Sequence, residues 1–169
     1  MLNRSRCRLF LAVMAAIVGL SCFILDQVSK SWAFKHLTPL TLSSLAYKPF
    51  IPGLLHLTLV TNTGGAFGFG CGNNTALALL AAAIMTGVFI WVWQREKSGR
   101  YLNILQWCGV GFLAGGALGN LWDRLTLGHV IDFLDFAFIN FPVFNLSDVF
   151  VDIGIGLIVL GSLRAGSAH

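Results

Sequence analysis

The sequence predicts a mostly α-helical membrane protein with four transmembrane helices. Hydrophobic residues make up 56% of the 169-residue chain and charged residues only 11%, whereas about 25% of a soluble domain is charged. Four apolar stretches are each long enough to cross a bilayer, which takes about 20 residues. A soluble fold of this length cannot bury so much apolar surface, so a soluble enzyme, a disordered chain and a nucleic-acid-binding domain are excluded.

We expect one membrane-embedded domain over residues 1–169. The predicted helices span residues 9–25, 76–93, 102–121 and 144–163. Two long loops on one side of the membrane connect them: residues 26–75 join the first helix to the second, and residues 122–147 join the third to the fourth. An apolar first segment after a basic tail can also be a cleavable signal peptide, but the chain stays apolar afterwards, so we expect an uncleaved helix.

The distribution of basic residues predicts the orientation of the chain. Four spans place both termini on one side, and seven Lys or Arg residues lie in the tails and the short 94–101 loop: Arg4, Arg6, Arg8, Arg95, Lys97, Arg100 and Arg164. The two longer loops hold four, Lys30, Lys35, Lys48 and Arg124. Basic residues favour the cytoplasmic side, which predicts that both termini are inside.

Small residues recur in the third span, where Gly111, Gly115 and Gly119 are spaced by four. This spacing lets helices approach closely in lipid. It predicts helix packing and carries no information on catalysis.

The first long loop offers two features with open interpretations. Asp26 and Lys30 are four residues apart and share a helix face, which fits either an interfacial salt bridge or a role near a site. Residues 56–61 partly alternate and predict a short strand, with Leu57 and Leu59 on one side. The Gly-rich stretch 62–70 is either a close backbone approach, a flap over a site or a flexible turn.

Acidic residues gather in and after the second long loop. Five of the seven acids of the chain lie there: Asp123, Asp132, Asp135, Asp148 and Asp152. Carboxylates among apolar residues at a membrane are costly. Two that meet can share one proton and act as base and acid on a water molecule. Single Asp residues at helix ends are also common caps, and the spacing does not say which two meet.

Five short motifs appear in order on the predicted outer side: LDQVSK at 25–30, NTGGAF at 62–67, GNLWDR at 119–124, VIDF at 130–133 and FNLSD at 144–148. With these motifs the chain resembles the lipoprotein signal peptidases (signal peptidase II), a family of intramembrane aspartic peptidases. The resemblance covers nearly the whole chain. It implies a small β-sheet cradle in the first outer loop and a catalytic dyad of Asp132 and Asp148. It also implies supporting or substrate-binding residues at Asn62, Gly64, Asn120, Asp123, Arg124, Asn145, Asp26 and Lys30.

The resemblance implies removal of the signal peptide from diacylglyceryl-modified bacterial prolipoproteins, by cleavage before the lipidated Cys. It further implies a multi-pass protein of the bacterial cytoplasmic (inner) membrane, with its active site on the periplasmic side, that works as a monomer among membrane lipids. No metal or cofactor is expected, because the sequence has no motif for ATP, dinucleotide or zinc. The alternative from another class is a small proton- or cation-coupled transporter subunit.

Two positions depart from the family pattern. Ser147 stands where the family usually has Ala, and Asp152 is an additional acid one helical turn after Asp148. An Asp that faces lipid is very costly, so we expect Asp152 to face inward or to reach water. If it faces the dyad, like-charge repulsion should raise a neighbouring pKa.

Overall fold

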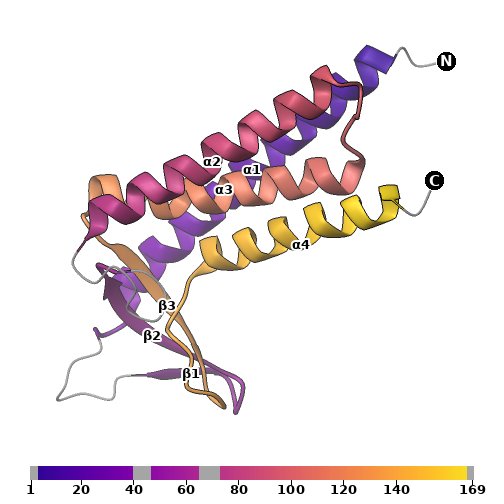
Figure 1. The fold of residues 1–169 in the computed structure, drawn as a ribbon. Coiled ribbons are helices and arrows are strands. Elements are labelled where there is room, and N and C mark those ends of the chain that lie inside the picture. Colours follow the sequence, from indigo (N-terminus) through magenta and orange to yellow (C-terminus); the bar gives the residue numbers. More distant parts are fainter. Residues whose placement is uncertain (1–3, 40–46, 65–72, 167–169) are drawn as a thin grey trace.

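The described part of the chain, in a computed structural model, comprises residues 4–39, 47–64 and 73–166. Most of the Gly-rich stretch 62–70 lies outside it. Within these ranges the chain forms four helices and a three-stranded antiparallel sheet (Figure 1). The elements are α1 (Arg4–His36), β1 (Lys48–Ile51), β2 (Leu55–Asn62), α2 (Asn74–Lys97), α3 (Ile104–Thr126), β3 (Val130–Phe136) and α4 (Leu146–Gly166).

All four of these helices are long and apolar enough to cross a membrane, which confirms the predicted fold class. α1 has 33 residues and is therefore about 50 Å long, more than the roughly 30 Å of a hydrocarbon core. Its last turns extend past the apolar segment 9–25. This extension brings Asp26 and Lys30 to the end of the bundle where the sheet begins.

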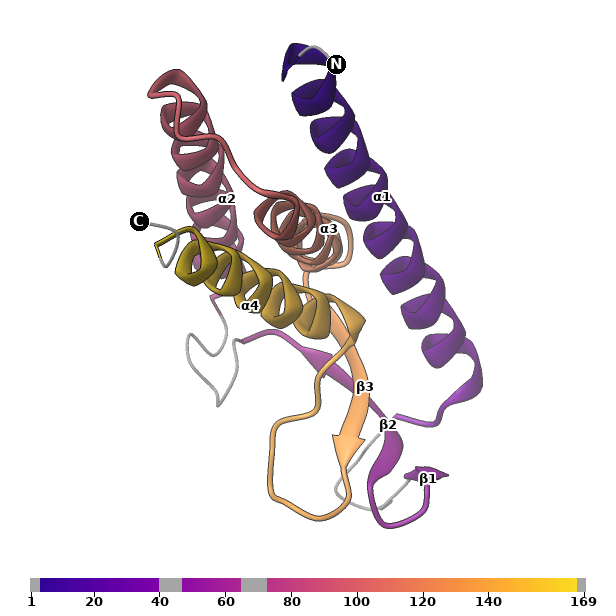
Figure 2. The ribbon, with the colours of Figure 1, turned by 90° about the vertical axis from the view of Figure 1, so that its right-hand side faces the viewer.

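α3 is the central helix of the bundle and contacts α1, α2 and α4 (Figure 2). Its glycines make the approach to α1 and α4 possible. A Cβ on Gly115 would lie 2.3 Å from the carbonyl oxygen of Gly19 in α1, and a Cβ on Gly116 would lie 2.4 Å from that of Ser147 in α4. Such contacts are too short for any larger residue, so the small-residue spacing is used for helix packing.

The sheet stands at one end of the bundle, and both termini lie at the other end (Figure 1). Its strand order is β1-β2-β3. The resemblance implied a small sheet in the first outer loop, and β1 and β2 do lie there. The third strand, β3, comes from the second loop and pairs with β2, with Val60 opposite Asp132 and Asn62 opposite Val130. An isolated sequence pattern identifies an extended segment but not its partner strand, which is why the third strand was not predicted.

The sheet is attached to the bundle by a small core of Ala33, Leu57, Phe133 and Leu134. The predicted alternation in β2 is incomplete, because Thr58 is buried as well as Leu57 and Leu59. A register irregularity between Leu57 and Val60 breaks the regular pairing with β3 at this point. The sheet is thus fixed against the end of α1, directly beside the polar end of the bundle.

Candidate active site

Asp148 lies in the first turn of α4, where Asn145 is the residue before the helix. The Asn145 side-chain oxygen accepts the N–H of Asp148 at 3.1 Å, and the Asp148 carboxylate accepts the N–H of Asn145 at 3.2 Å. This is a reciprocal capping arrangement that satisfies two N–H groups of the helix start. The capping interpretation of Asp148 is therefore correct, and it leaves the second carboxylate oxygen free for another partner.

Asp132 lies in β3 and is held by an amide side chain from the neighbouring strand. Asn62 donates from Nδ2 to Oδ2 of Asp132 at 2.8 Å. The two residues are diagonal neighbours across the β2–β3 pair, a position from which side chains on one face can touch. The N–H of Gly64 donates to Oδ1 of Asn62 at 2.9 Å, which fixes the orientation of the Asn62 amide toward Asp132.

Two further amides join the carboxylates of Asp132 and Asp148. Nδ2 of Asn145 donates to Oδ1 of Asp132 at 2.6 Å and to Oδ1 of Asn120 at 3.1 Å. Nδ2 of Asn120 donates to Oδ1 of Asp148 at 2.8 Å. Asn145 is completely buried. The structure thus brings together Asp132 from the sheet and Asp148 from α4, through neutral hydrogen-bond donors only.

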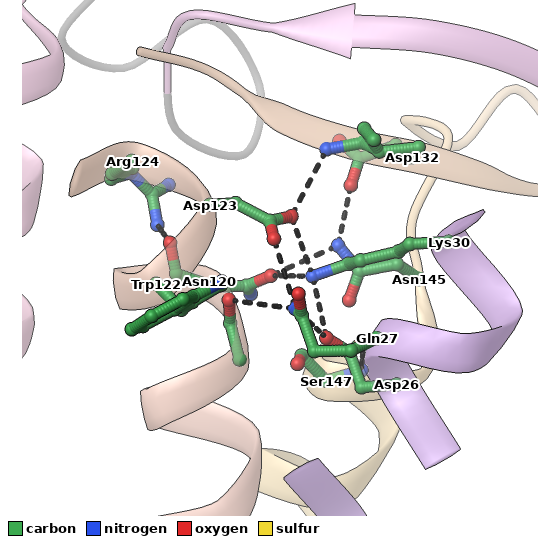
Figure 3. Close-up of polar contacts among 12 residues, drawn as sticks. Asp26, Gln27, Lys30, Asn120, Trp122, Asp123, Arg124, Asp132, Asn145 and Ser147 are labelled. Carbon is green, nitrogen blue, oxygen red and sulfur yellow. Dashed lines mark hydrogen bonds and ion pairs between the residues drawn. The ribbon is translucent and has the colours of Figure 1, made fainter. Parts of the chain in front are cut away.

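Behind these amides lies a buried ionic group, which we call the Lys30 cluster: Asp26, Gln27, Lys30 and Asp123 (Figure 3). Nζ of Lys30 is 2.8 Å from the Asp26 carboxylate, 2.9 Å from that of Asp123 and 2.9 Å from Oδ1 of Asn120. These three acceptors match the three N–H donors of an ammonium group. Asp26 and Lys30 do form an ion pair, and it is buried inside the protein.

The Lys30 cluster connects all the elements that carry the site. Asp26 in α1 accepts the N–H of Ser147 at the start of α4 at 2.9 Å. Asp123 in α3 accepts Nε2 of Gln27 at 2.9 Å and the N–H of Ile131 in β3 at 3.4 Å. The cluster therefore fixes the positions of α1, α3, β3 and α4 relative to one another.

A cavity of about 520 Å³ opens beside Asp132 and Asp148. Both acids line it together with Asn62, Asn120 and Arg124, and Asp152 lies in the same wall. The remaining lining is mostly apolar: Val130, Phe136, Phe141, Pro142, Val143, Phe144, Val149, Val151 and Ile153. A concave, mainly apolar cavity with a few convergent polar groups is typical of a binding site for an apolar substrate.

Burial raises the pKa of Asp132 to about 6. The hydrogen bond from Asn62 opposes this change, the nearby Asp148 carboxylate adds to it, and Asn145 and Lys30 oppose it. A carboxyl group with a pKa near 6 exchanges its proton close to neutral pH, as general acid–base catalysis requires.

The residues predicted for the site fall into two groups. Asn62, Asn120, Arg124, Asp132 and Asp148 line the cavity, with Asn145 and Gly64 behind them, whereas Asp26, Lys30 and Asp123 form the Lys30 cluster. Asp135 is outside both groups and accepts a hydrogen bond from Thr58 at 3.2 Å. Gln27 was not predicted, although it lies inside the first motif, and neither was the aromatic lining at Phe136, Phe141 and Phe144.

A second cavity, of about 440 Å³, lies between α1 and α3 and is lined only by apolar or glycine residues, among them Gly19, Phe23 and Trp122. It holds no group that could exchange a proton. Within the described ranges no three His, Cys, Asp or Glu side chains are placed to hold a metal ion.

Comparisons with known proteins agree with this geometry. Residues 18–164 match the family described as Signal peptidase (SPase) II. A lipoprotein signal peptidase of Nostoc punctiforme is 39% identical over 148 residues, which cover 88% of each chain. One of Gloeothece citriformis is 44% identical over 117 residues, 69% of this chain and 71% of the relative. A solved bacterial membrane enzyme superposes with a TM-score of 0.78 at 26% identity, covering 92% of this chain and 90% of the other.

Proposed function

The chain belongs to the signal peptidase II family, and we propose that it uses Asp132 and Asp148 as an aspartic dyad. As a member of that family it is a peptidase that removes signal peptides from bacterial prolipoproteins, and it is a multi-pass protein of the inner membrane. The catalytic type, the residues that act and the side of the membrane on which they act are part of the proposal.

One observation carries the proposal: a single buried residue, Asn145, donates to both carboxylates, from its side-chain Nδ2 to Asp132 and from its backbone N–H to Asp148, and both carboxylates line the same cavity. Among the acids of this chain, Asp132 and Asp148 are the two that both accept from Asn145 and line one cavity. A proton-coupled transporter would instead need acids along a path at mid-depth, whereas these lie at the sheet end of the bundle.

In the proposed reaction, a water molecule between the two carboxyl groups attacks the carbonyl carbon of the scissile peptide bond. Asp148 takes the proton of the water, and Asp132 donates a hydrogen bond and then its proton to the carbonyl oxygen. The tetrahedral intermediate then collapses: Asp132 takes a proton back from one hydroxyl group of the intermediate, the C–N bond breaks, and the leaving amine takes a proton from Asp148, which restores both groups. No covalent intermediate is needed.

Asp132 is assigned the shared proton for two reasons. Its pKa of about 6 lies well above the ordinary value of 3.8, mainly because of burial. Asp148 lies at the N-terminus of α4 and accepts a backbone N–H there, and the positive end of a helix dipole favours an ionised carboxylate. In this proposal Asp132 is the acid and Asp148 the base, two chemically identical groups in opposite roles.

The other residues of the site position the dyad and the substrate. Asn62, Asn120 and Asn145 hold the carboxylates, with Gly64 orienting Asn62. Arg124 is the one cation among the described residues that line the cavity. It donates from Nη1 to the backbone carbonyl of Asn120 at 3.3 Å, and its other N–H groups can bind a carbonyl group of the substrate backbone. The Lys30 cluster does not line the cavity. Lys30 donates to Asn120, which in turn donates to Asp148, so the cluster positions the dyad indirectly.

We further propose that the sheet end of the bundle is the outer, periplasmic side and that both termini are cytoplasmic, in agreement with the basic residues of the tails. The chain then acts as a monomeric single domain over residues 1–169. Its substrate is a diacylglyceryl-modified prolipoprotein cut before the lipidated Cys, because the signal helix and the lipid both lie in the membrane at the depth of the cavity.

The test is cleavage of a lipidated prolipoprotein by the detergent-purified protein, with the non-lipidated precursor as control. Wild type should cleave only the lipidated form, and Asp132→Asn and Asp148→Asn should cleave neither. Cleavage that survives in either variant would remove that residue from the dyad, and equal cleavage of both precursors would contradict the proposed substrate.

A further inference from the structure

Asp152 differs from every other acidic residue of the chain. All seven acids lie in the described ranges, and six of them have a hydrogen-bond or ion-pair partner there. Asp26 and Asp123 pair with Lys30, Glu96 with Arg8, Asp132 with Asn62, Asp135 with Thr58 and Asp148 with Asn120. Asp152 alone has no partner among the described residues, although it lies in a helix that is apolar enough to cross a membrane.

The position of Asp152 relates it to the dyad. It is exposed and lines the cavity that Asp132 and Asp148 share. Four residues separate it from Asp148, which corresponds to about 6 Å along the axis of α4. Because α4 runs away from the sheet, Asp152 lies deeper in the bundle than the dyad. The neighbouring carboxylate that raises the pKa of Asp132 is that of Asp148.

The face of α4 that carries Asp148 and Asp152 continues one turn further to Gly156. A Cβ placed on Gly156 would meet no atom within 4 Å, so no described residue covers this face below Asp152. Gly154, by comparison, packs so tightly on α3 that a Cβ would lie 2.6 Å from the N atom of Leu113. One side of α4 is therefore closed by α3. Within the described part of the chain, the side that carries both acids leaves room for a substrate segment.

We propose that Asp152 is a specificity-determining residue that accepts a hydrogen bond from a side chain of the signal peptide about two residues before the cleaved bond. The proposal rests on the proposed function. An extended chain advances about 3.5 Å per residue, so about two residues cover the 6 Å from the dyad to Asp152. A carboxylate at a membrane is costly without a partner, and a hydroxyl group of the substrate supplies one.

The test compares Thr and Val, which have the same shape and differ by one hydroxyl group. Lipidated prolipoproteins carry either residue at each of the three positions before the lipidated Cys, and kcat/KM is measured for the detergent-purified full chain. Wild type should prefer Thr at one of these positions by about tenfold, the effect expected of one hydrogen bond to a charged group. The preference should disappear in Asp152→Leu and be reduced in Asp152→Asn, whose amide oxygen still accepts.

The matched control is Asp135→Asn, which removes an acid outside the cavity and should keep the wild-type ratio of Thr to Val. A ratio that is the same in wild type and in Asp152→Leu at all three positions would overturn the proposal, and so would a wild type without any preference. A wild type that cleaves none of the lipidated substrates would instead contradict the proposed function, so the two failures are distinguishable.

Discussion

The Lys30 cluster and the dyad both bury two carboxylates at the same end of the bundle, but they hold them differently. In the cluster, an ammonium group lies 2.8 and 2.9 Å from the two carboxylates and forms an ion pair with each. In the dyad, the donors to Asp132 and Asp148 are neutral amides and one backbone N–H. A carboxylate paired with a cation is a structural element, whereas one held by neutral donors can still take up and release a proton.

The strongest test of this difference removes the charge from each dyad residue while keeping its shape. Asp132→Asn and Asp148→Asn should each lower kcat by at least about 10³-fold, since one acid–base group contributes about 10²–10⁴-fold and the second group cannot act alone. The melting temperature in detergent should stay near that of wild type, because no buried cation loses its partner. Asp135→Asn, outside the site, should keep both activity and stability.

The opposite result is expected in the Lys30 cluster. Lys30→Met leaves Asp26 and Asp123 buried without their cation, and breaking a buried ion pair in this way costs about 3–5 kcal/mol. We expect a large decrease in the melting temperature, with activity lost because α1, α3 and α4 no longer hold their positions. A Lys30→Met protein that melts like wild type but is inactive would instead place Lys30 in the chemistry.

The pH profile tests which dyad residue holds the proton. If protonated Asp132 is the acid, kcat/KM falls as pH rises through its pKa of about 6. The Asn62 hydrogen bond lowers that pKa, so Asn62→Leu should raise it and move the alkaline limb to higher pH, by up to about one unit for the loss of one hydrogen bond. The apparent values belong to the coupled pair, so the shift between variants is the quantity to compare.

Thr58→Val is the control for this measurement. It removes a hydrogen bond to a carboxylate in the same sheet, that of Asp135, and should leave the limb in place. An acidic limb that moves to higher pH in Asn62→Leu, with no change on the alkaline side, would make Asp132 the base and Asp148 the acid.

The difference between the Lys30 cluster and the dyad also shows which features could be predicted from the sequence. Apolar length predicts four helices, and the spacing of Asp26 and Lys30 predicts their pairing, because both signals are local. The pairing of Asp132 with Asp148 is not local: it depends on the register of β3 against β2 and on the return of the chain to the start of α4. Only the resemblance to a family singled out these two of the five acids as the expected dyad. That Asp152 has no hydrogen-bond or ion-pair partner among the described residues could be seen only in the structure.

The smallest expected effect lies where the two regions meet, at Ser147. Its N–H donates to Asp26 of the Lys30 cluster and it precedes Asp148 of the dyad, but its buried hydroxyl has no hydrogen-bond partner among the described residues. An unsatisfied buried hydroxyl costs about 1–3 kcal/mol, so Ser147→Ala should raise the free energy of unfolding by about 1 kcal/mol. Activity should stay within about a factor of two, because the N–H that contacts Asp26 is kept.

Ser162→Ala is the matched control of opposite sign, because the Ser162 hydroxyl donates to the carbonyl of Ile158 and accepts from Nε2 of Gln106. Its loss leaves the Gln106 amide unpaired at that contact and should lower the melting temperature in detergent. If Ser147→Ala also lowers the melting temperature, the hydroxyl has a partner, such as a bound water between the cluster and the dyad. The Lys30 cluster and the dyad would then be joined by hydrogen bonds through Ser147. A change of charge in one of them would then alter the protonation of the other.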